Sequence, residues 1–353
     1  MPTPTAPDAG VWCLEEAAER AEPGPAPGAG RPTFEAPMSG HTTRGRLLAA
    51  LVTLLTLVGL TACANREQPA GQTATTPTPI GADRFPVEVA VAGGKPVTLE
   101  RRPERVVSLS PTATEMLFAV GAGKQVVAVD SLSNHPAEAP RTDLSAYTPN
   151  VEAVVGHRPD LVVAAEDRND LVAGLTRVEV PVLLLPAATA LEGTYEQIEA
   201  LGKATGHRTE ATDLTRRMRS DIDKIVRDTP RPGRELSYYH ELDPQLYSAT
   251  SKTFIGQVYG LFGLRNIADS ADPTGSGYPK LSAEHVVNAN PDLIFLADDE
   301  SRETLASRPG WQSINAVKQN AVVTLEADTS SRWGPRIIDL VRQVSDAVSK
   351  AAG

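Results

Sequence analysis

Short apolar runs alternate with segments of helical periodicity along most of the chain after residue 84. The runs are bounded by polar, glycine or proline residues, as expected of buried strands. They lie at residues 106–109, 126–129, 161–164, 182–185, 236–240, 293–296 and 322–325. Strands that alternate with helices in this way predict an α/β protein with parallel sheets.

The helical segments carry recognisable starts and stops. Ser110 followed by Pro111 predicts an N-cap with proline in the first turn, and Gly121 predicts the end of that helix. Met116 and Leu117 would form part of its buried face. Further helices are expected at residues 151–155, 253–261, 282–288 and 335–352, and a β-hairpin at residues 87–92 and 97–100.

A longer helical region spans residues 191–228 and is interrupted by Gly206. We therefore expect two helices, the second at about residues 209–228, where Met218 and Ile222 share a face. About 20 helical residues rise roughly 30 Å, enough to bridge two lobes. Pro230 follows and ends the helix.

One pattern occurs twice, 132 positions apart. Glu, Val, Val, Pro, Asp and Leu take identical offsets in residues 152–161 and 284–293. A duplicated unit indicates two similar lobes, and a cleft between lobes is a favoured ligand site. We predict two Rossmann-like lobes, residues 84–190 and 231–353, joined by a single long backbone helix within residues 191–230.

Residues 38–62 have the layout of a secretory signal sequence. A basic start containing Arg44 and Arg46 precedes an apolar run at residues 47–60, which is shorter than a membrane span. The small residues before Cys63 resemble a bacterial lipobox. This implies cleavage before Cys63 and a lipid on its sulfur that holds an exported protein to the outer face of the cell membrane. An ordinary signal peptide and a short membrane helix are the alternatives.

The segments on either side of this signal are not expected to fold. Residues 1–37 are rich in proline and acidic groups, which does not suit the start of a signal peptide. We expect translation to start at Met38; otherwise residues 1–37 form a disordered extension. Residues 63–83 are rich in Thr, Pro, Ala and Gln and predict a flexible tether.

Charge and cysteine content exclude some classes of protein. The net charge is −10, which speaks against a nucleic-acid-binding surface. Cys13 and Cys63 are the only cysteines, so the mature chain would have no disulfide framework and no thiol nucleophile.

The run from Arg105 to Gly123 resembles the start of the class III solute-binding proteins of ABC importers, which bind cobalamin, ferric siderophores or haem. The two copies of the repeat and the sequence Trp-Gly-Pro-Arg at residues 333–336 add to the resemblance, which covers about residues 101–352. It implies two α/β lobes joined by one long helix. It also implies a monomer that works with a permease dimer and its ATPases, and no cofactor besides the cobalt or iron of the ligand.

The resemblance also implies a role for the repeated glutamates. Glu152 and Glu284 would dock onto arginines of the permease dimer. Two like carboxylates, one per lobe, can meet two equivalent basic sites on a symmetric partner. The alternative is that each glutamate only favours its helix N-terminus electrostatically. The aspartates of the repeat, Asp160 and Asp292, are expected to shape turns.

Aromatic and polar residues near strand ends are the ligand-binding candidates. They suit a large, partly flat ligand, although each could instead be ordinary packing. In the first lobe they are Ser110, Pro111, His135 and Tyr147, and in the second Tyr238, Tyr239, His240, Tyr247, Tyr278, Arg332 and Trp333. Trp311 is expected to be a structural anchor.

Comparison with cobalamin-binding members supports part of an aromatic cage. Tyr147 and Tyr278 fall where those proteins have tryptophans, whereas His135 and His240 replace a tyrosine and a phenylalanine. Ala165 replaces a further tryptophan. Cobalamin is the first choice of ligand. Ferric siderophores and haem are the alternatives, with His240, His135 or Tyr147 as an axial haem ligand.

An exported hydrolase is the main rival, and the sequence gives it little support. Residues 121–124 resemble part of a phosphate loop but lack its first glycine and its Ser/Thr. The chain has no Gly-x-Ser-x-Gly motif, and its six histidines are scattered, which argues against a catalytic zinc site. We therefore predict a binding protein and not an enzyme.

Overall fold

The computed structural model describes residues 84–298 and 300–352, all of which belong to one compact unit. The predicted signal sequence, Cys63, the tether and residues 1–37 lie outside the described residues. Within residues 84–352, apart from residue 299, the structure contains no helix long and apolar enough to cross a membrane.

The first lobe is built on a four-stranded parallel sheet in the order β4-β3-β5-β6. Its strands are β3 (Val106–Leu109), β4 (Val126–Val129), β5 (Leu161–Ala164) and β6 (Val182–Leu184). Its helices are α2 (Pro111–Ala119), α3 (Val151–Gly156) and α4 (Leu171–Thr176), with a 3-10 turn, η1 (Ala122–Gln125), before β4. A separate antiparallel hairpin of β1 (Val87–Val89) and β2 (Val97–Leu99) precedes them.

The second lobe has a separate four-stranded parallel sheet, in the order β10-β9-β7-β8. Its strands are β7 (Ser237–Glu241), β8 (Arg265–Asn266), β9 (Leu293–Leu296) and β10 (Val322–Thr324). Its helices are α7 (Phe254–Gly260), α8 (Ala283–Ala289), α9 (Arg302–Ser307) and α10 (Asn315–Lys318), and short 3-10 turns lie at η2 (Asp269–Ala271) and η3 (Trp311–Ser313).

The two sheets have the same topology. Counted from the first strand of each lobe, both read 2-1-3-4. In such sheets the strand order reverses between strands 1 and 3, and ligands bind outside the carboxyl ends at that point. The switch points here are β3/β5 and β7/β9. The duplicated sequence pattern thus corresponds to a duplicated topology.

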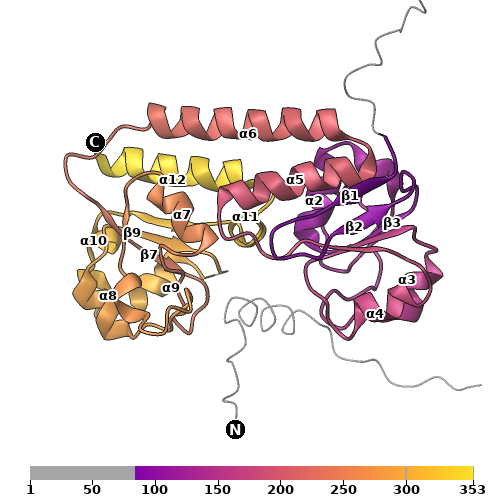
Figure 1. The fold of residues 1–353 in the computed structure, drawn as a ribbon. Coiled ribbons are helices and arrows are strands. Elements are labelled where there is room, and N and C mark those ends of the chain that lie inside the picture. The colour runs from indigo at the N-terminus through magenta and orange to yellow at the C-terminus, as the bar shows by residue number, and fades with distance from the viewer. Residues whose placement is uncertain (1–83, 299, 353) are drawn as a thin grey trace, which may run out of the picture. The chain divides into compact units, whose positions relative to one another are not determined.

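A layer of helices connects the lobes. α5 (Leu191–Thr205) packs on α2, and α6 (Arg208–Asp228) packs on both α5 and α12 (Ile337–Ala352). Figure 1 shows α6 lying along α5 at one end and along α12 at the other. α12 in turn contacts α7 of the second lobe, and α11 (Ala327–Ser331) precedes it. One hydrophobic core runs through this layer and one face of each sheet.

The expected elements are largely confirmed. Gly206 separates α5 from α6 with a φ of +73°, and Ser110 caps α2 with Pro111 in its first turn. Helices α4, α9, α10 and α11 and strand β8 were not predicted. The domain boundaries at residues 190 and 230 remain a proposal.

Candidate functional site

In a parallel sheet, the loops that follow the carboxyl ends of the strands lie at the same edge, and ligands bind there. In the first lobe these loops are residues 130–150 after β4 and residues 165–170 after β5. In the second lobe they are residues 242–253 after β7 and the segment after β10 that contains α11. Five of the eleven predicted ligand-binding residues lie on these segments: His135, Tyr147, Tyr247, Arg332 and Trp333.

An ion-pair bridge joins the carboxyl edges of the two sheets. Arg332, which follows β10 and α11, donates to Glu115 Oε1 of α2 at 2.8 Å. Arg336 donates to both oxygens of the same carboxylate, at 2.8 and 3.0 Å. The Glu115 side chain is only 2% exposed and that of Arg332 only 9%. A buried carboxylate with two guanidinium partners therefore holds the end of the second sheet against the first lobe.

Hydrogen bonds extend this bridge to the loop after β4. Arg332 also donates to Asn134 Oδ1 at 2.9 Å and to the carbonyl of Leu132 at 3.2 Å. Asn134 donates to Asp328 Oδ2 of α11 at 2.7 Å. These contacts place the loop after β4 directly beside the loop after β10. The two carboxyl edges therefore adjoin one another.

Two predicted ligand-binding residues, Arg332 and Trp333, make contacts between the lobes. The Arg332 side chain is occupied by Glu115 and by Asp328, to which it donates at 2.8 Å. The Trp333 indole N–H donates to Gln197 Oε1 of α5 at 3.0 Å. Both residues connect the second lobe to the first through these hydrogen bonds.

Two further candidates lie in the core. Tyr238 is 1% exposed and His240 is fully buried, because β7 is a central strand covered on both faces. The Tyr238 hydroxyl accepts a hydrogen bond from Asn266 at 2.6 Å, and its ring lies 4.2 Å from that of Tyr259. The expectation that these side chains face a ligand is corrected by their burial, and His240 is unsuited to be an axial haem ligand in this conformation.

Burial also shifts the pKa values of the neighbouring side chains Tyr238, His240 and Tyr259. His240 Nδ1 lies 2.8 Å from the Tyr259 hydroxyl, and desolvation lowers the His240 pKa to about 3. Desolvation likewise raises the pKa of Tyr238 and of Tyr259.

Neighbouring Tyr239 is fully buried and packs edge-on against Trp311, which confirms Trp311 as a structural anchor.

Other predicted ligand-binding residues keep exposed surface. His135 is exposed, and Pro111, Tyr147, Tyr247 and Tyr278 are partly exposed. Ser110 is 4% exposed because its hydroxyl accepts the Ala113 N–H as the cap of α2. The exposed members come from both lobes.

Sequence reasoning missed two cations beside these tyrosines. The Arg168 guanidinium lies over the Tyr147 ring, 5.3 Å from its centroid. The Lys280 ammonium lies 5.4 Å from the centroid of the Tyr247 ring. Their position after strand ends was the only signal in the sequence, and it does not distinguish them from other loop cations.

Glu152 and Glu284 occupy equivalent exposed positions in the first turns of α3 and α8. The side chains that cap these helices are Asn150 and Ser282, each of which accepts a backbone N–H. The glutamates are therefore not required as hydrogen-bonding caps. Their carboxylates remain at the surface of each lobe.

The aspartates of the repeat are structural, as expected. Asp160 accepts the backbone N–H groups of Glu104 and Arg105, which enter β3. Asp292 accepts the Ser237 N–H at 2.9 Å and pairs with Arg234 at 2.7 Å. The Arg234 guanidinium is the main reason that the pKa of Asp292 is lowered to about 2.

A group of three carboxylates is the candidate metal site within the described residues. Oxygens of Glu241, Asp298 and Glu300 lie within 4.8 Å of one another at the carboxyl edge of the second sheet. Arg308 already donates to Glu241 at 2.8 Å and also to Glu300. Burial raises the pKa of Glu241 to about 7 against the opposing effect of Arg308. The Arg308 guanidinium thus occupies the position beside these carboxylates that a metal ion would take.

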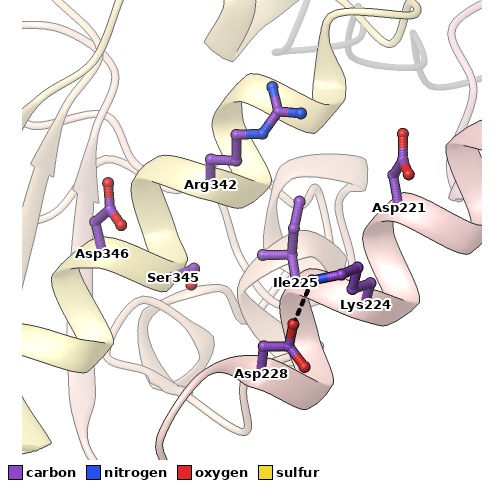
Figure 2. Close-up of a pocket in the computed structure, with 7 residues that line it drawn as sticks. All are labelled: Asp221, Lys224, Ile225, Asp228, Arg342, Ser345 and Asp346. Atoms are coloured by element: carbon purple, nitrogen blue, oxygen red, sulfur yellow. Dashed lines mark hydrogen bonds and ion pairs between the residues drawn. The ribbon is translucent and has the colours of Figure 1, made fainter.

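A surface groove lies away from the strand edges, between α6 and α12. Figure 2 shows its charged walls, with Lys224 bonded to Asp228 at 2.6 Å and Arg342 on the facing helix. None of its lining residues belongs to a loop after a strand, and it contains none of the predicted ligand-binding residues. It is therefore not the candidate ligand site.

Comparison with known sequences gives three informative matches. The family model for "Periplasmic binding protein" matches residues 106–329. An uncharacterized ABC transporter substrate-binding lipoprotein, YvrC, of Bacillus subtilis is 31% identical over 314 residues, covering 86% of this chain and 97% of the relative. A cobalamin-binding protein of Halobacterium salinarum is 32% identical over 322 residues, covering 86% of this chain and 85% of the relative.

A solved structure shares the fold. It belongs to a possible iron-binding, periplasmic solute-binding protein of Staphylococcus epidermidis. The TM-score is 0.62 at 25% sequence identity, and the match covers 70% of this chain and 99% of that chain.

Proposed function

We propose that this chain, which belongs to the periplasmic binding protein family, is the substrate-binding lipoprotein of an ABC importer. It captures a large ligand that contains cobalt or iron and delivers it to a permease dimer. The observation that carries the proposal is the pair of sheets with one strand order, whose carboxyl edges adjoin at the Glu115–Arg332 bridge. Two such edges supply ligand contacts from both sides.

The ligand binds between the two edges, against Pro111, His135 and Tyr147 of the first lobe and Tyr247 and Tyr278 of the second. The bridge and the helix layer hold these edges in place, so affinity comes from a largely preformed site. The chain binds and releases its ligand without covalent chemistry. Its family and its relatives are binding proteins, which supports this view.

Two kinds of ligand remain candidates. Cobalamin is supported by the name of the Halobacterium salinarum relative and by the position of Tyr147 and Tyr278. An iron chelate, either haem or a ferric siderophore, is supported by the name of the Staphylococcus epidermidis protein. The cations beside Tyr147 and Tyr247 favour the second kind.

Anchoring by a lipid on Cys63 is supported by the lipobox-like sequence and by the lipoprotein relative. It would place the two lobes on a tether at the outer face of the membrane, next to the permease. Fractionation of cells that carry Cys63→Ala tests this: the protein should leave the membrane fraction, and continued anchoring would contradict the proposal.

Docking is proposed to use Glu152 and Glu284. Charge reversal of both residues to Lys should lower uptake of radiolabelled cobalamin or haem at least tenfold, because two like charges would then meet the arginines of the permease. Ligand affinity of the purified variant should stay within about twofold, since both side chains lie on outer helices.

The matched control is Glu303→Lys, which alters another exposed first-turn glutamate, in α9. It should leave uptake unchanged. Normal uptake by the double variant would refute the docking role, and loss of ligand affinity would place the glutamates in the binding site.

A further inference from the structure

Each lobe carries one tyrosine whose ring is covered by a cation at the carboxyl edge of its sheet. The pairs are Tyr147 with Arg168 and Tyr247 with Lys280. The distances from cation to ring centroid, 5.3 and 5.4 Å, are nearly the same. Both fall within the range in which a cation is attracted to an aromatic face.

The first pair spans the middle of its sheet. Tyr147 lies in the loop after β4 and Arg168 in the loop after β5, and these two strands flank β3 on opposite sides. Arg168 thus stands near the switch point β3/β5, where ligands of such sheets bind.

The second pair, Tyr247 and Lys280, lies at the carboxyl edge of the sheet of the second lobe. Tyr247 follows β7, and it pairs with Lys280 in an isolated antiparallel bridge. Lys280 is exposed, while the Tyr247 side chain below it is partly buried. The backbone bridge fixes the position of the Lys280 backbone beside Tyr247.

Both cations keep exposed surface. The Arg168 side chain is 24% exposed, and its partner Glu166, at 3.0 Å, is 46% exposed. An ion pair this exposed is weak, so an acidic group on a ligand can compete with Glu166. The ring beneath each cation restricts its motion, which reduces the entropy lost when an anion binds.

We propose that Arg168 and Lys280 determine specificity by each binding an acidic group on the rim of one flat metal chelate. This inference rests on the proposed function, since it needs one ligand to contact both lobes. The shared ligand chemistry is a pair of separated carboxylates around a metal-binding body. Haem, with two propionates, and a ferric carboxylate chelate both have it, whereas the rim of cobalamin carries amides.

Binding titrations of the full chain test this with haem, ferric citrate and cobalamin as probes. Wild-type protein should bind haem or ferric citrate at least tenfold more tightly than cobalamin. Arg168→Gln and Lys280→Gln should each weaken binding of that anionic probe at least fivefold. Raising the salt concentration should weaken ligand binding by the wild type more than by the double variant. The double variant lacks the two charge pairs that salt would screen.

Three comparisons keep the outcomes distinct. Arg168→Lys and Lys280→Arg should restore most of the affinity, and Lys318→Gln on exposed α10 should have no effect. Unchanged affinity of the Gln variants, or tightest binding of cobalamin, would overturn this inference and leave the proposed function standing. Failure of the wild-type protein to bind any of the three probes would contradict both.

Discussion

At the scale of single residues, His240 shows what burial does to a polar side chain. Its ring is fully buried, Nδ1 is bonded to the Tyr259 hydroxyl, and Nε2 has no hydrogen-bond partner among the described residues. Desolvation lowers its pKa to about 3. The folded protein therefore keeps this histidine neutral at pH values where an unfolded chain would protonate it.

This difference makes stability depend on pH in a definite direction. Below pH 6.5 the unfolded chain binds a proton at His240 that the folded chain does not, so the free energy of unfolding falls as pH decreases. The loss is about 1.4 kcal/mol per pH unit, or roughly 2 kcal/mol between pH 6.5 and pH 5. Urea unfolding of wild type and His240→Gln at both pH values measures it.

The stability advantage of the wild type over His240→Gln should shrink by that amount on acidification. Glu241, whose raised pKa acts in the opposite direction, is present in both proteins and cancels in the comparison. The same substitution at exposed His135 is the control. If the free energies of unfolding of wild type and His240→Gln changed in parallel with pH, the prediction would be contradicted. The buried ring would then take up a proton in the folded state as it does in the unfolded chain.

Residue types alone could not assign these roles. The sequence places Tyr238 and His240 near a strand end, but only the coverage of β7 on both faces shows that they are core residues. Arg332 was predicted to face a ligand, and nothing in the sequence indicated its ion-pair partner Glu115, which lies 217 positions away. Contacts between residues so far apart in the chain leave no local pattern in the sequence.

At the scale of elements, the joint between α5 and α6 depends on two glycines. Gly206 adopts a left-handed φ of +73° at the end of α5. Gly202, one turn earlier, packs against the start of α6. A Cβ there would lie 2.3 Å from that of Ala211 and 2.8 Å from the His207 carbonyl oxygen. The close approach of the two helices requires glycine at this position.

We predict that Gly202→Ala destabilises the protein by about 2 kcal/mol, because the added methyl group forces the helices apart. Denaturant unfolding measures the change. Gly156→Ala in α3 is the control, since nothing lies within 4 Å of the added Cβ there. A Gly202→Ala protein as stable as the wild type would show that the helix pair has room to adjust.

Elements with strong local signals were predicted well. The cap at Ser110, the break at Gly206 and the apolar run of β9 specify their elements without help from distant residues. β8 has only two residues, and the helices α9 and α10 have six and four. Elements that short depend on packing more than on periodicity, so the sequence did not show them.

At the scale of the whole molecule, the repeat at Glu152 and Glu284 predicted two lobes, and the structure has two sheets of the same strand order. What the sequence could not predict is how the carboxyl edges meet. That depends on the Glu115 bridge and on the packing of α6 against α5 and α12. These long-range contacts turn two duplicated lobes into one candidate binding site.

The central claim is that a single ligand contacts the carboxyl edges of both lobes at once. Hydrogen–deuterium exchange of the full chain, with and without saturating haem or cobalamin, tests it most directly. The account predicts protection in residues 130–147 and 165–170 of the first lobe together with residues 242–250 and 268–281 of the second. Protection confined to one lobe, or to the α6–α12 groove of Figure 2, would contradict it.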